Sequence, residues 1–277
     1  NPYTSTILGD VRKITNELYG EAIDNLNVDI VAAGVPCQGF SLANLKRNVE
    51  DERNFLFLEV IRFINLYNPK VVIIENVSGM RSLGNGEFEI AIAEALASSG
   101  NLGYKVKREL LNAADYGVPQ MRKRVVFVGY KKGKFEFPLE NKEYVTCEMA
   151  LSDLPPLIDS IGSEKMKYEK SAHNDYQRMM RKHSQEVYNH IAAKHSEKVK
   201  YIISLVPAGE NYKSLPEELK NTRNFHVAWT RFPDSKPAPT IDTGHRHHFH
   251  YKYNRVPTVR ECARIQSFPD DFIFLGN

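Results

Sequence analysis

A cysteine, a glutamate and two arginines occur at places in this chain where side chains could do chemistry together. Cys37 follows a short apolar run and a glycine, and Glu75 directly follows four aliphatic residues. Arg122 and Arg124 stand at the start of another apolar run. A thiol becomes a nucleophile when it is deprotonated, and a nearby cation favours that thiolate. A carboxyl group can act as a general acid, and an arginine can bind charge that develops on a substrate.

Each of these residues also has an ordinary structural interpretation. A free cysteine is often a small buried apolar residue. Glu75 could be an acid that favours the dipole at a helix N-terminus, and Arg122 and Arg124 could be solvated side chains at a strand entrance. Taken together, however, their positions at strand ends indicate a site.

Through residues 1–130, short β-branched runs alternate with amphipathic stretches. Strands are predicted over Asp29–Ala33, Val71–Ile74, Tyr104–Leu111 and Arg124–Tyr130, and helices around Ile14–Ala22, Phe55–Ile64 and Gly86–Ser98. This alternation predicts an α/β fold with a doubly wound, mostly parallel sheet. Ligands bind at the carboxyl ends of the strands in such sheets, where Cys37 and Glu75 are expected.

The second half of the chain is irregular and basic. Residues 161–255 hold 17 lysines and arginines against 10 acids, and all nine histidines lie in 173–250. An excess of cations indicates a polyanion partner, although a lysine-rich solvated surface is the alternative. Helix is predicted within Asp175–Leu205, and a final helix begins after Thr258, with Glu261 completing a capping box.

Composition and cysteine usage exclude several classes of protein. The 277 residues contain no apolar run near the ~20 needed to span a membrane. The three cysteines are widely spaced, which argues against a disulfide framework and fits a reducing compartment. No metal is expected, because His245, His247, His248 and His250 have one close acid, Asp242, and no nearby cysteine.

Four segments, taken in order, resemble the motifs of the DNA cytosine-5 methyltransferases. They are Pro36-Cys37-Gln38, Glu75-Asn76-Val77, Gln120-x-Arg122-x-Arg124 and Arg260–Gln266. The resemblance covers nearly the whole chain, although Val35 stands where the family usually has a second proline. It implies a Rossmann-like methyltransferase domain with a smaller, irregular target-recognition domain. With Pro155-Pro156 as the boundary, we predict a catalytic domain over 1–157, target recognition over 158–256 and a return to the catalytic domain over 257–277.

The resemblance also implies a mechanism. The thiolate of Cys37 would attack C6 of a flipped cytosine, while Glu75 protonates N3. Arg124 would bind O2, with Arg122 and Asn76 as supports. C5 would then take the methyl group of S-adenosylmethionine, and loss of the C5 proton would expel the cysteine.

Further roles follow from the same resemblance. The cofactor-binding residues would be Asp10, Val11, Pro36 and Leu56, and the DNA-binding residues would be Gln38, Ser41, Arg53, Gln120, Arg231, Thr240 and Ile241. The family's glycine-rich methionine-binding loop is expected to precede residue 1, and its closing block to continue beyond Asn277.

The leading hypothesis is therefore a DNA cytosine-5 methyltransferase acting on a specific double-stranded site. We expect a monomeric, cytoplasmic and nucleoid-associated enzyme that forms the modification half of a restriction system with a cognate endonuclease. The alternatives are a catalytically silent DNA-binding relative and an RNA cytosine methyltransferase on the same scaffold. A cysteine hydrolase ranks last, because it needs a histidine base near Cys37 and the histidines lie in the other predicted domain.

Overall fold

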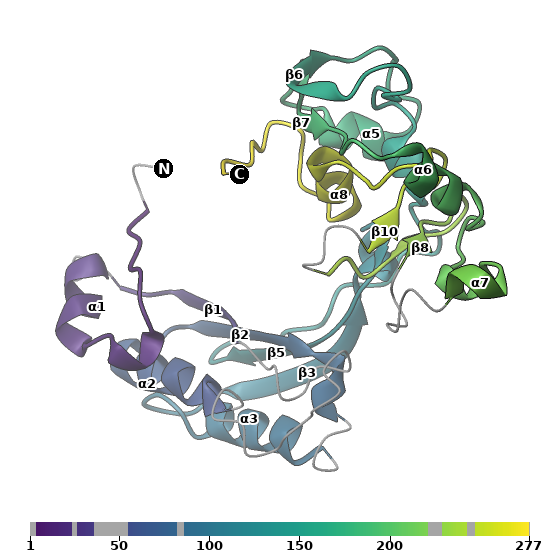
Figure 1. The fold of residues 1–277 in the computed structure, drawn as a ribbon. Helices are drawn as coiled ribbons and strands as arrows, with labels where there is room; N and C mark the ends of the chain where they lie inside the picture. The colour runs from purple at the N-terminus through teal and green to yellow at the C-terminus, as the bar shows by residue number, and fades with distance from the viewer. Residues whose placement is uncertain are drawn as a thin grey trace. The chain divides into compact units, whose positions relative to one another are not determined.

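The computed structural model describes residues 4–23, 27–35, 55–81, 86–220, 229–242 and 247–276 (Figure 1). The chain packs as two compact units. The first, called the sheet unit below, comprises Asn1–Leu111 and Lys123–Pro138. The second unit comprises Asn112–Arg122 and Leu139–Asn277.

The sheet unit is built on four strands in the order β1-β2-β5-β3. These strands are β1 (Ile30–Gly34), β2 (Val71–Val77), β3 (Lys105–Asn112) and β5 (Lys123–Tyr130). β1 and β2 are parallel, whereas β5 is antiparallel to β2. All four predicted strands form, because their β-branched residues suit a pleated, partly buried surface.

Helices cover this sheet and complete its core. They are α1 (Asn16–Ile23), α2 (Phe57–Tyr67) and α3 (Glu87–Ala97), with the short 3-10 helices η1 (Val11–Lys13) and η3 (Ser78–Arg81). α2 and α3 lie along one face of the sheet (Figure 1), where Ile64, Ile74 and Ile92 share one buried cluster. Asn68 caps the C-terminal end of α2: it adopts a left-handed φ of 51° and donates its N–H to Ile64 O. The predicted α/β class is confirmed.

The second unit consists of short elements. Its strands pair in twos: β6 (Gly162–Lys167) with β7 (Glu186–Ile191), β8 (Thr230–Arg231) with β10 (His248–Phe249), and β4 (Gln120–Met121) with β9 (Ala238–Pro239). Its helices are α4 (Cys147–Leu151), α5 (Asp175–Met180), α6 (Glu197–Ser204), α7 (Glu217–Lys220) and α8 (Val259–Ile265), with η5 (Ala113–Tyr116) and η6 (Tyr212–Ser214). The helix predicted within residues 175–205 forms as α5 and α6, separated by β7.

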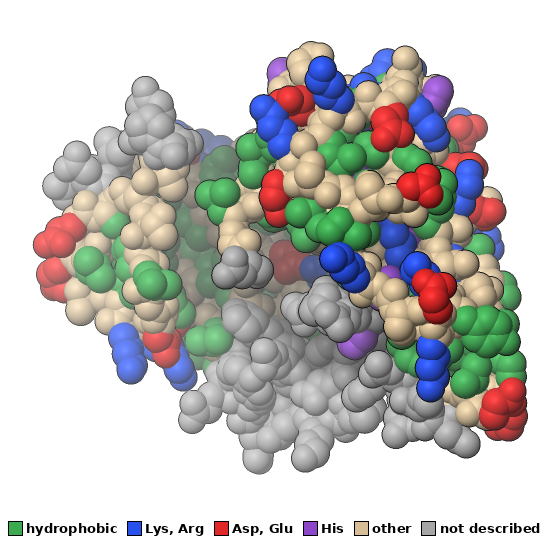
Figure 2. Space-filling view, turned by 45° about the horizontal axis from the view of Figure 1, so that its top comes forward, with side chains coloured by type: hydrophobic (Ala, Val, Ile, Leu, Met, Phe, Trp, Pro, Cys, Tyr) green, Lys and Arg blue, Asp and Glu red, His purple; other side chains and the backbone are tan. Residues whose placement is uncertain are grey.

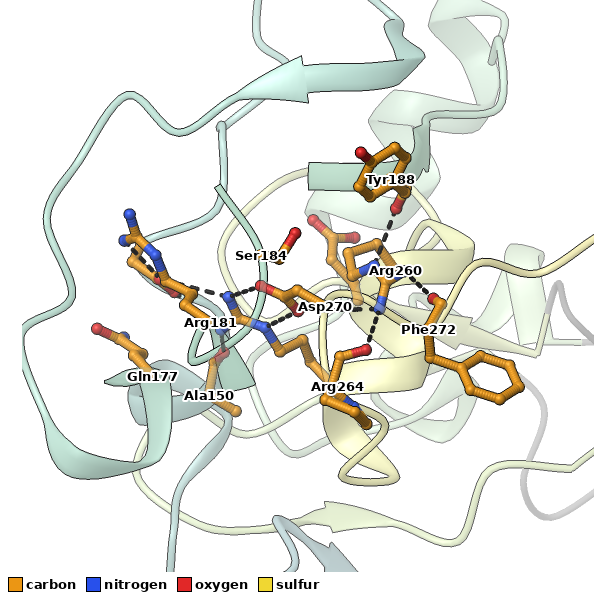
Figure 3. A network of polar contacts seen from close by, with 12 residues as sticks. Ala150, Gln177, Arg181, Ser184, Tyr188, Arg260, Arg264, Asp270 and Phe272 are labelled. Atoms are coloured by element: carbon orange, nitrogen blue, oxygen red, sulfur yellow. Dashed lines mark hydrogen bonds and ion pairs between the residues drawn. The ribbon is translucent and has the colours of Figure 1, made fainter. Parts of the chain in front are cut away.

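Helix α8 organises the core of the second unit through buried arginines (Figure 3). Arg264 contacts Asp270 Oδ1 at 2.6 Å and Asp153 Oδ1 at 3.0 Å, and all three side chains are fully buried. Arg260 donates to the carbonyls of Tyr188 and Pro269. The predicted capping box is confirmed: Thr258 Oγ1 accepts from Glu261 N, and the Glu261 carboxylate accepts from Thr258 N.

Packing and the predicted functional domains divide the chain at different places. Residues 139–157 and 257–277 pack with the second unit, although the sequence assigns both segments to the catalytic domain. The functional limits at residues 157 and 256 stay a prediction. None of the helices in the described ranges has the length and hydrophobicity needed to cross a bilayer.

Candidate active site

Glu75 and Arg124 form an ion pair on neighbouring strands of the sheet unit. In the antiparallel register Val77 lies opposite Arg124, so Glu75 is its diagonal neighbour on the same face. Arg124 Nε lies 2.6 Å from Glu75 Oε1. The Glu75 side chain is 41% exposed and that of Arg124 is 20% exposed, so the carboxylate avoids the cost of full burial. This pair is partly open to solvent and able to meet a ligand.

The end of β1 lies directly beside this pair. Gly34 is the register partner of Glu75, and a β-carbon built on Gly34 would lie 3.7 Å from Glu75 Oε2. The predicted nucleophile Cys37 follows Gly34 by three residues. Five predicted site residues lie outside the described residues, namely Pro36, Cys37, Gln38, Ser41 and Arg53.

The two other cysteines of the chain lie in the second unit, where Cys147 is buried and Cys262 is partly buried. Cys147 is fully buried at the start of α4, and burial raises the pKa of its thiol. Burial also raises the pKa of the Cys262 thiol to about 12. Because the thiolate is the reactive form, neither group is prepared for nucleophilic attack at neutral pH.

Asn76 lies on the opposite face of β2 from Glu75. Its side chain is 1% exposed, and its Oδ1 accepts the N–H of Val77 at 2.7 Å. Adjacent residues of a strand point to opposite faces, so Asn76 shapes the strand end from the core side. A supporting role for Asn76 in catalysis stays a prediction.

Gln120, Thr240 and Ile241 meet in the second unit, where β4 pairs with β9. Gln120 is 1% exposed, and its Oε1 accepts from Ile241 N at 3.2 Å. Thr240 Oγ1 donates to Met121 O at 2.7 Å. The structure thus brings together three of the residues predicted to bind DNA, and Gln120 is the buried one among them. Within the same unit, the carbonyl of Arg122 accepts the N–H of Ala113 at 2.9 Å.

Arg231 is buried in the second unit and binds backbone. Its guanidinium donates to Val206 O at 2.6 Å and to His250 O at 3.0 Å, and it also reaches Ile203 O, Tyr253 O and Asn254 Oδ1. A cation at the carbonyls that close α6 complements the helix dipole. Sequence reasoning missed this structural role. A direct DNA contact by Arg231 stays a prediction that this burial does not favour.

One of the predicted cofactor residues, Val11, lines a largely apolar cavity in the sheet unit. Val11 lines a cavity of about 440 Å³ together with Tyr19, Ala32 and Phe63. Asp10 pairs with Arg12 at 2.6 Å, and the hydrogen bonds from Arg12 lower the pKa of its carboxyl to about 2. Leu56 directly precedes α2. A largely apolar cavity of this size lies in the range of small-molecule sites in proteins. No spacing in the sequence predicted the contributions of Tyr19 and Phe63.

The histidine-rich stretch contains one exposed ion pair and two buried rings, those of His248 and His250. His247 Nδ1 lies 2.8 Å from Asp242 Oδ2, and His248 is buried with its ring 5.4 Å from that of Phe232. Within the described ranges, no three side chains of His, Cys, Asp or Glu converge as metal ligands.

Comparisons with known proteins give one consistent match. A family model described as C-5 cytosine-specific DNA methylase matches residues 1–277. The Type II methyltransferase M.DdeI of Desulfomicrobium norvegicum is 36% identical over 298 residues, covering 100% of this chain and 70% of that protein. The Type II methyltransferase M1.HphI of Haemophilus parahaemolyticus is 35% identical over 271 residues, covering 96% of this chain and 66% of that protein. The chain thus spans about two thirds of the length of these relatives.

One solved structure supports the fold. It is an E. coli prophage protein assigned as a DNA modification methyltransferase, with a TM-score of 0.73 and 24% identity. The match covers 95% of this chain and 75% of that one. At this identity the likeness concerns the fold alone.

Proposed function

Because the chain belongs to the C-5 cytosine-specific DNA methylase family, whose members are S-adenosylmethionine-dependent DNA methyltransferases, we propose that it methylates C5 of a flipped cytosine in a specific duplex site. The observation that carries the proposal is the Glu75–Arg124 pair beside the end of β1. It supplies an acid and an anion-binding cation at one sheet edge. The relatives' restriction-modification names support the same role for this chain, with a cognate endonuclease as its counterpart.

Chain connectivity keeps the proposed nucleophile near this pair. Cys37 follows Gly34 by three residues, a span of at most about 11 Å along an extended chain. Gly34 is itself the register partner of Glu75. This short span allows the proposed thiolate to reach a cytosine ring held by Glu75 and Arg124.

The proposed chemistry assigns one task to each group. The Cys37 thiolate adds to C6 while Glu75 donates a proton to N3, which relieves the negative charge pushed into the ring. Arg124 donates hydrogen bonds to O2, where charge also develops. S-adenosylmethionine supplies the methyl group that C5 receives. Solvent water then takes the C5 proton, which re-forms the double bond and expels the thiolate, and N3 returns its proton to Glu75.

The cofactor and the DNA would use different parts of the chain. The apolar cavity lined by Val11 would hold the adenosine part of the cofactor. Asp10, Leu56 and Pro36 would also contact the cofactor, as the family resemblance implies. Gln38, Ser41 and Arg53 would contact the DNA around the flipped base. The second unit would read the site through Thr240 and Ile241, supported by Gln120.

Methyl transfer to duplex DNA tests this proposal. The full-length protein should transfer labelled methyl from S-adenosylmethionine to cytosine C5, and Cys37→Ala should abolish transfer. A duplex with 5-fluorocytosine at the target should trap a covalent complex, because fluorine cannot leave as the C5 proton does. Cys262→Ala is the matched control and should retain activity. Absence of label from the folded wild-type protein would instead support a silent DNA-binding relative or an RNA substrate.

A further inference from the structure

The second unit contains an aromatic pocket that the proposed reaction does not use. It encloses about 250 Å³ and lies against α6, β10 and the residue that precedes β8. Val199 and Ile203 of α6, together with Trp229, Phe249 and Val256, form its apolar wall. The rings of Trp229 and Phe249 lie 6.3 Å apart and are inclined by 37°. Such a wall suits a flat ring that stacks on an aromatic face.

Trp229 is held in an unusual backbone conformation. Its φ is +55°, in the left-handed region that a bulky residue rarely adopts. The next two residues fix it there, because Thr230 N donates to His247 O and Arg231 is clamped to the end of α6. A strained residue that its surroundings over-determine is a reason to look for a ligand.

A basic groove adjoins the aromatic pocket. The two share Lys194 and His195, and the groove of about 380 Å³ is also lined by Lys200, Arg255 and one carboxylate, Asp159. His195 Nε2 accepts the N–H of Val256 at 3.2 Å, which orients the ring at the shared rim. The charge of Arg255 is engaged by Glu261 at 2.6 Å. Lys194 and Lys200 are exposed. Lys200 pairs with Glu197 at the surface, where a bound anion can take the place of that carboxylate.

We propose that the pocket and groove together bind one unstacked nucleotide of a DNA strand, which rests on the proposed function for the choice of DNA. Its base would stack in the pocket of Trp229 and Phe249, and its phosphate would lie by Lys194 and Lys200. Base stacking on aromatic side chains beside a cationic track is how proteins hold single-stranded nucleic acid. The excess of lysines and arginines in residues 161–255 favours a polyanion over an apolar peptide.

Tryptophan fluorescence gives a direct test. Trp229 is the single tryptophan of these 277 residues, and Trp229→Phe identifies its contribution in the full-length protein. Titration with a short single-stranded oligonucleotide should quench this signal saturably. An abasic oligonucleotide of equal length should bind without quenching it. Equal affinity for a free mononucleotide would overturn the assignment to a DNA strand.

Variants separate the two halves of the site. Val199→Phe, at a partly exposed position, should fill the pocket. The affinity for the oligonucleotide, measured by quenching, should fall by about tenfold, and the circular dichroism spectrum should not change. Lys194→Ala should reduce the salt slope of binding by about 0.7. Lys198→Ala is the matched control, because this exposed lysine lies on α6 but lines neither the aromatic pocket nor the basic groove. Equal losses in Lys194→Ala and Lys198→Ala, or undiminished quenching in Val199→Phe, would overturn the proposal.

Methyl-transfer assays distinguish this inference from the proposed function. Methylation without Trp229 quenching would reject the nucleotide site alone. Quenching without methylation would retain the site and reject the enzyme.

Discussion

The sheet unit and the second unit both pair arginine with carboxylates, but in opposite environments. Arg124 meets Glu75 at a strand end where the side chains are 20% and 41% exposed. Arg264 meets Asp153 and Asp270 in a core where all three side chains are 0% exposed. Figure 2 shows, for the residues drawn in colour, that charged side chains also lie scattered over the face in view. Chemical type alone therefore does not separate a site from a scaffold.

Solvent access and the number of partners make the difference. Arg264 binds two carboxylates and Ala150 O, so every direction of its guanidinium is engaged. Removing one partner from a buried pair leaves a charge without compensation, which is strongly destabilising. Arg124 has the Glu75 contact and its neighbour's carbonyl, Lys123 O at 2.8 Å. A partly exposed pair contributes little to stability, so Arg124 can exchange its contact with Glu75 for one with a substrate.

The largest expected effect is on catalysis at the sheet unit. Glu75→Gln keeps the shape of the side chain but removes its acid, so methyl transfer should fall by about 10²- to 10⁴-fold. The free energy of unfolding should change little, because the side chain is 41% exposed. Single-turnover transfer of labelled methyl and urea unfolding measure the two quantities. A large loss of stability would show that this pair is structural, like the one in the second unit.

The next effect is on the stability of the second unit. Arg264→Met removes the cation that buried Asp153 and Asp270 share and leaves them only the more distant Arg181 and Arg260, which should cost about 3–5 kcal/mol of unfolding free energy. Arg178→Met is the control, because its pair with Asp175 is exposed and should contribute little. Urea midpoints followed by circular dichroism compare the variants. Equal midpoints for both would contradict the contrast between buried and exposed pairs.

The sheet unit follows from its sequence better than the second unit does. Strand periodicity predicts where Glu75 lies, and alternation along β2 explains why Asn76 faces the other way. The capping box of α8 is also local, since Thr258 and Glu261 are three residues apart. Arg231 was predicted to bind DNA, but its acceptors include carbonyls of residues 203, 206, 250 and 253. No local pattern encodes contacts that distant segments create, and the same holds for the pocket around Trp229.

The smallest effect is the acid sensitivity of the second unit, through Glu261. Burial alone would raise the pKa of this carboxyl, but the charge and hydrogen bonds of Arg255 hold it well below the ordinary 4.5. The contribution of Glu261 to stability is therefore complete above pH 4.5, and it declines at lower pH because the unfolded chain takes up the proton first. Burial lowers the pKa of His250 to about 3, whereas this histidine titrates near 6.5 in the unfolded chain. A second loss of unfolding free energy therefore begins as the pH falls below 6.5, because the unfolded chain takes up this proton first.

Unfolding free energies at pH 6, 4.5 and 3.5 test this sign in the wild type and in Arg255→Met/Glu261→Gln. The double variant removes the buried pair, while glutamine can still cap Thr258. Below pH 4.5 the wild type should lose up to about 1.4 kcal/mol per pH unit more than the variant, which is the linkage of one proton. Parallel curves would show that the acid loss arises elsewhere.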